Sequence, residues 1–374
     1  MLSARSCVTP AQILGGSCLR ALATFSRVAT DNGLMQQNSV SPSYVAAELQ
    51  ARDLRDNHDF GEAASSAQTA ADIAMRDGDV ESWRLMTFFR AECLLAAGEF
   101  DDCAEVATSL IEQTHATSTQ LIAQAHILRA KAHQGTGLLE SAAAEARAAA
   151  DMTTEEADVE INVKARQALI AALADSGKIE EAWVESLIMA DSVAAEVDDQ
   201  LLGKAYWVIG NVAFLCNKVR EGLHYHELAA ETLSPARNLD VWAKFNKASA
   251  AMRLAADVAD SDTLRCIERA ELATDVIGGS EDDHNLLRLN RGHWNYLAGD
   301  MKTAIGLLEA VCADADKTVP QILGEACLLL GRAYSATGDQ EQAAAYLHQA
   351  AEHFEMAGAP QRADQAREYL AAQT

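Results

Sequence analysis

Proline and aromatic residues, which interrupt or compete with helices, are scarce in this sequence. Its 374 residues include only 5 prolines, and phenylalanine, tryptophan and tyrosine together make up 5%. Alanine, the strongest helix former, occurs 74 times. Because the aromatic residues that favour strands are rare as well, the composition predicts an all-α chain.

Basic residues are also in short supply. Lysine and arginine number 30 against 55 aspartates and glutamates, which gives a formal net charge of −25. A field of this sign repels nucleic-acid phosphates and anionic membrane surfaces unless the few cations cluster. The sequence has no run of about 18 apolar residues, the length that a transmembrane helix requires. We therefore expect neither direct binding to nucleic acid nor association with a membrane.

Motifs for metal, cofactor and covalent chemistry are missing as well. The eight cysteines are scattered without a C-x-x-C pair, which indicates reduced thiols in a cytoplasmic protein rather than disulfides or a zinc site. His126 and His133 would share a helix face, but no third ligand follows at metal-binding spacing. Glycine-rich phosphate loops and a nucleophile with a suitably spaced base are absent too. We therefore expect no catalytic, cofactor-binding or metal-binding residues and no enzymatic activity.

Residues 1–40 differ in composition from the rest of the chain. Before Asp31 they contain three arginines and no acid, together with many serines, threonines and alanines. One interpretation is a transit-like targeting segment, because such peptides are rich in arginine and serine and poor in acids. The other is a disordered leader or a mis-assigned start, with translation beginning at Met35. Under either interpretation we expect residues 1–40 to lie outside the fold.

Short turns recur through the remaining sequence at a nearly constant spacing of about 40 residues. Five of them contain glycine and a sixth contains asparagine, and these two residue types tolerate the left-handed conformation that ends a helix. The six positions are Gly98, Gly137, Gly177, Asn217, Gly299 and Gly338. The same spacing places two further turns, one near Asp257 and one within Asn57–Phe60. Eight helix–turn–helix units then fill residues 41–360, and residues 361–374 follow as a polar capping helix.

Small residues flank the turns at fixed distances. Seven positions before the turn, the sequence has Ala91, Ala130, Gly210, Ala250, Gly292 and Gly331, with Ile170 as the exception. About five positions after it, the sequence has Cys103, Ala142, Ala182, Gly222, Ala304 and Ala343. Small side chains at two facing positions let paired helices approach closely, because larger ones hold the backbones apart. The spacing therefore predicts tightly packed helix pairs.

This arrangement resembles the tetratricopeptide repeat. The last unit carries the resemblance best, with Leu330-Gly331-Arg332-Ala333-Tyr334, Gly338, Ala343 and Leu347, closed by Pro360. The period of about 40 residues exceeds the roughly 34 of the family and is similar to that of long-helix variants in bacterial signal-sensing regulators. The resemblance implies an all-α, right-handed superhelical solenoid of about eight repeats. It also implies a scaffold whose ligands lie in a concave groove lined by the first helix of each repeat.

Several basic and polar residues would line such a groove. Lys164, Lys204 and Lys244 lie 40 residues apart, thirteen positions before successive turns. Columns six and ten positions before the turns complete the set of candidate ligand-binding residues: Lys131, Lys164, Lys204, Asn211, Lys244, Lys247 and Arg332. A basic strip within an acidic chain focuses its field on an anionic ligand, such as a peptide carboxylate or an acidic segment. The alternative is that duplicated repeats inherited solvated lysines, since Lys178 and Lys218 also lie 40 residues apart.

The leading functional hypothesis is a non-enzymatic, cytoplasmic scaffold that binds a peptide or protein partner in its concave groove. The alternative is the sensory or regulatory module of a peptide-responsive transcription regulator. Regulators of that class carry such repeats behind a helix–turn–helix domain, for which residues 1–40 are too short. A regulatory module of this kind would lack its own DNA-binding domain and act through a separate partner.

Overall fold

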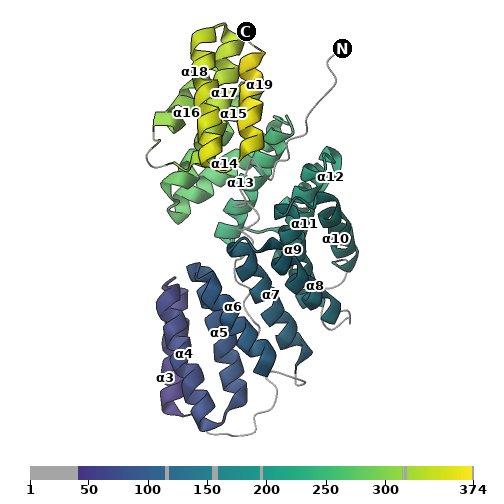
Figure 1. The fold of residues 1–374 in the computed structure, drawn as a ribbon, viewed down its shortest axis with the longest axis vertical. Coiled ribbons are helices and arrows are strands. Elements are labelled where there is room, and N and C mark those ends of the chain that lie inside the picture. Colours follow the sequence, from purple (N-terminus) through teal and green to yellow (C-terminus); the bar gives the residue numbers. More distant parts are fainter. Residues whose placement is uncertain are drawn as a thin grey trace. The chain divides into compact units, whose positions relative to one another are not determined.

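The computed structural model describes residues 41–113, 118–153, 159–193, 197–313, 315 and 318–372, so the predicted leader, 1–40, lies outside the described residues. These ranges contain 17 α-helices and no strand (Figure 1), which confirms the prediction of an all-α chain. The helices are α3 (Pro42–Asp56), α4 (Phe60–Asp77), α5 (Val80–Ala97), α6 (Phe100–Gln113), α7 (Thr119–Gly135), α8 (Leu139–Met152), α9 (Val159–Asp175), α10 (Ile179–Ser192), α11 (Asp199–Leu215), α12 (Val219–Thr232), α13 (Leu239–Ala255), α14 (Ser261–Ile277), α15 (Glu281–Ala298), α16 (Met301–Ala313), α17 (Pro320–Thr337), α18 (Gln340–Met356) and α19 (Pro360–Ala371).

The first 16 of these helices form eight successive pairs, each joined by a short turn. We call the odd-numbered members, from α3 to α17, the first helices and the even-numbered members, from α4 to α18, the second helices. The final helix, α19, follows the last pair and packs against α18. The repeat length inferred from the sequence is therefore the length of one helix pair.

A residue in the left-handed backbone conformation lies in each of the eight turns within pairs. These residues are His58, Gly98, Gly137, Gly177, Asn217, Asp257, Gly299 and Gly338, with φ between 56° and 89°. The two turns that the sequence placed by spacing alone, near 57–60 and near 257, are thereby confirmed. The turn at Asp257 is longer than its counterparts, since α13 ends at Ala255 and α14 begins at Ser261.

Polar side chains fix where several helices begin. The side chains of Ser118 and Asn238 accept hydrogen bonds from backbone N–H groups in the first turns of α7 and α13. At the start of α15, Ser280 and Asp283 form a reciprocal capping box. These caps satisfy donors that a helix leaves unpaired at its N-terminus. The short polar segments between pairs therefore stop one repeat and start the next.

The described chain divides at Asp198 into two compact units, which we call the N-terminal and C-terminal units. In the N-terminal unit α5 packs against α7 and α7 against α9, and in the C-terminal unit α11, α13, α15 and α17 pack in succession. Within a unit, each second helix packs against its own first helix and the first helix of the next repeat. The first helices thus form one layer of each unit and the second helices form the other, as in tetratricopeptide-like repeats.

The small residues lie where the paired helices cross. A Cβ atom added to Gly331 would lie 2.6 Å from Cγ of Leu347 and 3.2 Å from the carbonyl oxygen of Ala343. At Gly210 it would lie 2.2 Å from Cδ2 of His226. Ala142, Ala182, Ala304 and Ala343 on the facing second helices have no exposed surface. The small residues predicted to allow close approach are therefore at the contact itself.

The described cysteines are thiols, and Cys93, Cys103, Cys266 and Cys327 are buried. Burial raises the pKa of the Cys93 and Cys103 thiols to about 12, which keeps them protonated. Cys7 and Cys18 lie outside the described residues. In the described part of the chain, each helix is too short or too polar to cross a bilayer.

Candidate ligand-binding surface

All seven candidate ligand-binding residues lie on first helices. Lys131 on α7 and Lys164 on α9 belong to the N-terminal unit. The candidates of the C-terminal unit are Lys204 and Asn211 on α11, Lys244 and Lys247 on α13, and Arg332 on α17. Because Lys164 and the pair Lys204 and Lys244 fall in different units, a continuous stripe of the three lysines stays a prediction.

In the N-terminal unit, Lys131 and Lys164 belong to one charged cluster with Glu92 and Arg55. Burial raises the pKa of Glu92, while the charges of Arg55, Lys131 and Lys164 oppose that rise. Burial and the positive charge of Lys164 lower the pKa of Lys131. Lys164 Nζ is 2.6 Å from Glu160 Oε1, but Lys131 makes neither a hydrogen bond nor an ion pair with any described residue. Lys131, six positions before its turn, and Lys164, thirteen positions before the next turn, therefore belong to the same cluster. Among the described residues, Lys131 has no anionic partner in contact.

In the C-terminal unit, Lys204 and Asn211 are buried within the packing of α11, with 8% and 0% of their surface exposed. His226 Nε2 lies 3.1 Å from Asn211 Oδ1, and His226 Nδ1 lies 3.0 Å from Ser249 Oγ. This chain of polar groups links α11, α12 and α13. Asn211 therefore has a structural role in holding three helices together, which its position in the sequence column did not reveal.

The two candidate lysines of α13 are both neutralised by nearby carboxylates. Lys244 Nζ lies 2.8 Å from Asp240 Oδ2, one helical turn earlier. Lys247 forms an ion pair with Asp283 of α15, and that contact lowers the pKa of Asp283 against the effect of burial. These lysines therefore differ from Lys131, because each already has an anionic partner.

Arg332 of α17 has aromatic rather than anionic neighbours. Its Cζ lies 5.0 Å from the ring centroid of Tyr296 on α15 and 5.3 Å from that of Tyr369 on α19. Arg332 makes neither a hydrogen bond nor an ion pair with any described residue. The sequence columns did identify Arg332, but they missed both tyrosines, because Tyr369 lies beyond the last turn and Tyr296 occupies another position in the repeat.

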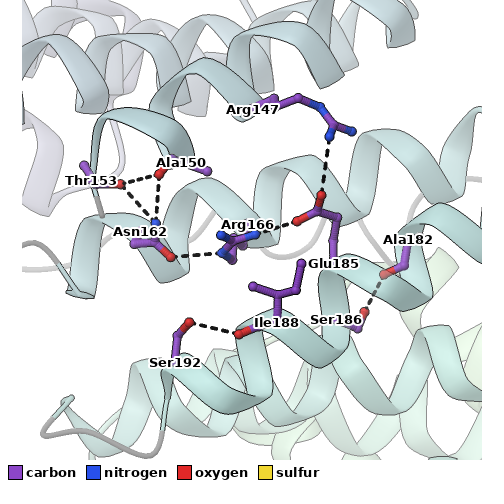
Figure 2. Close-up of polar contacts among 10 residues, drawn as sticks. All are labelled: Arg147, Ala150, Thr153, Asn162, Arg166, Ala182, Glu185, Ser186, Ile188 and Ser192. Atoms are coloured by element: carbon purple, nitrogen blue, oxygen red, sulfur yellow. Dashed lines mark hydrogen bonds and ion pairs between the residues drawn. The ribbon is translucent and has the colours of Figure 1, made fainter. Parts of the chain in front are cut away.

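Most other cations on the described helices form ion pairs, as the contact between α8, α9 and α10 illustrates (Figure 2). Arg166 of α9 donates to Asn162 Oδ1 at 3.0 Å and to Glu185 Oε2 of α10 at 2.5 Å. Arg147 of α8 reaches the other oxygen of the Glu185 carboxylate at 3.5 Å, and Asn162 donates to the carbonyl of Ala150. Such a network fixes neighbouring helices and leaves few cations for an anionic ligand.

The two histidines weighed as metal ligands do not assemble a site in the described chain. His126 Nδ1 lies 2.6 Å from Glu145 Oε2, and Arg129 donates to the same oxygen at 2.6 Å. No cluster of three or more His, Cys, Asp or Glu side chains suited to a metal ion occurs among the described residues. The contacts of His126 are those of a helix-linking network.

His226 makes the stability of the C-terminal unit depend on pH. Burial and the charge of Arg253 lower the pKa of His226 to about 3, whereas an unfolded histidine titrates near 6.5. The unfolded chain therefore binds the proton first, so the contribution of neutral His226 is complete above pH 6.5 and is lost as the pH falls towards 3. We expect His226 alone to lower the free energy of unfolding by about 2 kcal/mol between pH 7.5 and pH 5.

Urea unfolding at the two pH values measures this effect. The His226→Gln variant should lose about 2 kcal/mol less than the wild type on acidification. His224→Gln is the matched control, because His224 lies on the same helix and is exposed. Equal pH dependence in the two variants would show that His226 does not titrate in this way.

No known protein family and no curated protein matches this sequence, but several solved structures resemble the fold. The apo form of RapI matches with a TM-score of 0.53 at 11% identity, over 77% of this chain and 99% of that chain. A Rap protein complexed with competence and sporulation factor gives 0.50 at 13% identity, over 89% and 100% of the two chains. Aspartyl phosphate phosphatase F from Bacillus subtilis gives 0.54 at 12% identity, over 94% and 95%. At identities this low the likeness concerns the fold alone, and together with the helix pairs described above it shows that this chain has a tetratricopeptide-like helical-repeat fold.

Proposed function

We propose that this protein is a non-enzymatic scaffold that binds a peptide or protein partner through its layer of first helices. The observation that carries the proposal is a pair of cations, Lys131 of the N-terminal unit and Arg332 of the C-terminal unit, each of which lies on a first helix without an anionic contact among the described residues. A half-buried cation that contacts no anion is costly unless something else neutralises it. In a chain with a net charge of −25, an anionic group on a partner would do so.

Exposed apolar residues on first helices of the N-terminal unit support a macromolecular partner. Val45 and Leu85 both lie thirteen positions before their turns, and 41% and 47% of their surfaces are exposed. Leu49, four residues after Val45, is 62% exposed. Exposed apolar side chains beside a few charged groups are typical of surfaces that bind peptides and proteins. One structure of similar fold was solved with a bound factor, which is consistent with ligand binding by this architecture.

A crosslinking pull-down from the native cell tests the scaffold. The double variant Lys131→Gln with Arg332→Gln removes the two first-helix cations that have no anionic contact and should reduce recovery of the main partner about tenfold. The matched control, Lys178→Gln with Lys302→Gln, makes the same change in net charge at a turn and on a second helix. The proposal is wrong if the wild type captures no partner, or if the two double variants capture the same partner equally well.

A regulatory module is the second candidate, because one structure of similar fold was solved in complex with competence and sporulation factor and another is an aspartyl phosphate phosphatase. In that case the captured partner would itself be a regulator or its phosphorylated form. Release of phosphate from an aspartyl-phosphate substrate by the purified protein would contradict the non-enzymatic proposal. The proposal includes a cytoplasmic location, which the buried, unoxidised thiols of Cys93 and Cys103 support.

A further inference from the structure

Arg332 lies at the meeting point of three helices in the C-terminal unit. Tyr296 of α15 and Tyr369 of α19 place their rings around its guanidinium, and all three side chains are half-buried. Aromatic rings attract a guanidinium through their faces, but they supply no lone pairs to its five N–H groups. The rings therefore hold the cation in place while leaving its hydrogen-bond donors available to a ligand.

The other charged groups nearby, Arg362 and Glu325, already neutralise each other. Arg362 of α19 donates through Nε, at 2.9 Å, and through Nη2 to the two oxygens of Glu325 on α17, and its Nη1 contacts Gln365. His293 of α15 also faces Arg332 and Arg362, and burial together with these charges lowers its pKa to about 3, so His293 is neutral. One positive charge, that of Arg332, is left over.

We propose that Arg332, held between Tyr296 and Tyr369, is a carboxylate-binding subsite for a partner of this protein. This inference rests on the proposed scaffold function and adds to it the chemistry of one contact and a binding role for the last helix, which supplies Tyr369. A planar carboxylate matches the paired N–H groups of a guanidinium and forms strong charge-assisted hydrogen bonds.

The charge count favours a carboxylate over a phosphate dianion. One carboxylate cancels the single uncompensated charge of Arg332. A dianion would leave excess negative charge close to Glu325, in a chain that is already strongly acidic. The carboxylate can come from an acidic side chain or from the C-terminus of a peptide, and the two sources are separable by experiment.

Binding of short peptides to the full-length protein, measured by isothermal titration calorimetry at low salt, tests the subsite. The probes are acetyl-hexaglutamate amide, which has only side-chain carboxylates, and acetyl-hexaglutamine with a free C-terminus, which has only the terminal one. Arg332→Gln should weaken binding of at least one probe by about tenfold or more. Arg332→Lys keeps the positive charge but loses the paired N–H groups of the guanidinium, so it should give an intermediate loss of affinity.

Arg367→Gln is the matched control, because it removes one exposed arginine from α19 and changes the net charge equally. Its affinity for both probes should stay within about twofold of the wild type. Thermal melting confirms that each variant folds. The subsite is overturned if the wild type binds neither probe, or if Arg332→Gln and Arg367→Gln weaken binding equally. If Arg332→Gln captures the native partner as well as the wild type does, the subsite proposal is wrong while the scaffold function still stands.

Discussion

Replacing Arg362 with alanine is expected to lower the free energy of unfolding by about 3–5 kcal/mol, the largest effect of any substitution considered. Arg362 on α19 and Glu325 on α17 form an ion pair in which each side chain is only 8% exposed. Without Arg362, the carboxylate of Glu325 would be buried with no partner of opposite charge in contact. The guanidinium also lies 5.2 Å from the ring centroid of Phe354, so the substitution removes packing as well.

The loss of stability in Arg362→Ala should depend on pH. Burial raises the pKa of Glu325, and Arg362 opposes that rise. In Arg362→Ala the opposing charge is gone, so the folded-state pKa of Glu325 rises further and the folded chain takes up a proton more readily than the unfolded chain does. The deficit relative to the wild type should therefore shrink as the pH falls from 8 to 5, as urea unfolding at these two values would show.

Two controls separate the loss of the ion pair from a general loss of arginine. Arg291→Ala breaks the pair with Glu271, whose side chains are 28% and 34% exposed, and should cost only about 0.2–1 kcal/mol. Replacing Glu325 and Arg362 together with leucines removes both charges and should recover most of the lost stability. Equal losses in Arg362→Ala and Arg291→Ala would contradict the importance assigned to the buried pair.

Gly331→Leu is expected to lower the free energy of unfolding by about 3 kcal/mol, at the upper end of the range for overpacking. The first atom of the new side chain would already lie 2.6 Å from Leu347 and 3.2 Å from the backbone of Ala343. Leu347 belongs to the buried core of the last repeat and is only 1% exposed. The helices α17 and α18 must therefore separate.

Gly306→Leu is the matched control for this prediction. Gly306 lies within α16, and a Cβ atom there meets nothing within 4 Å. Leucine has a higher helix propensity than glycine, so this variant should be neutral or more stable by about 0.8 kcal/mol. Thermal and urea unfolding of both variants compare a crowded with an open site. If Gly331→Leu were as stable as Gly306→Leu, the assigned register of α17 against α18 would be wrong.

The repeat itself could be predicted from the sequence because it depends on local properties of the chain. Glycine and asparagine at Gly177 and Asn217 mark left-handed turns, and the constant spacing located the turn at Asp257, where no glycine is present. The small residues before and after each turn predicted where paired helices cross, since any side chain there competes for the same space. Turn conformation, helix propensity and side-chain volume are set by residues near one another in the sequence.

The partners of individual polar residues could not be predicted in this way. Asn211 and Arg332 occupy the same position relative to their turns, yet Asn211 is buried against His226 and Arg332 lies between Tyr296 and Tyr369. Lys247 likewise gave no sign of its ion pair with Asp283, which is 36 residues away. Residues at the same position in different repeats lie on the same face of their helices. Their neighbours, however, come from adjacent repeats, whose sequences differ.

By itself, therefore, the sequence determined the helical repeats of this protein, their number and the turns that separate them, because these follow from short-range sterics and periodicity. Only the tertiary structure decided which charges neutralise one another and which stay without a partner. That distinction depends on side chains far apart in the sequence, such as Arg291 and Glu271, 20 residues apart, or Arg362 and Glu325, 37 residues apart. It is a property of three-dimensional distance and burial, which set the strength of each interaction between charges.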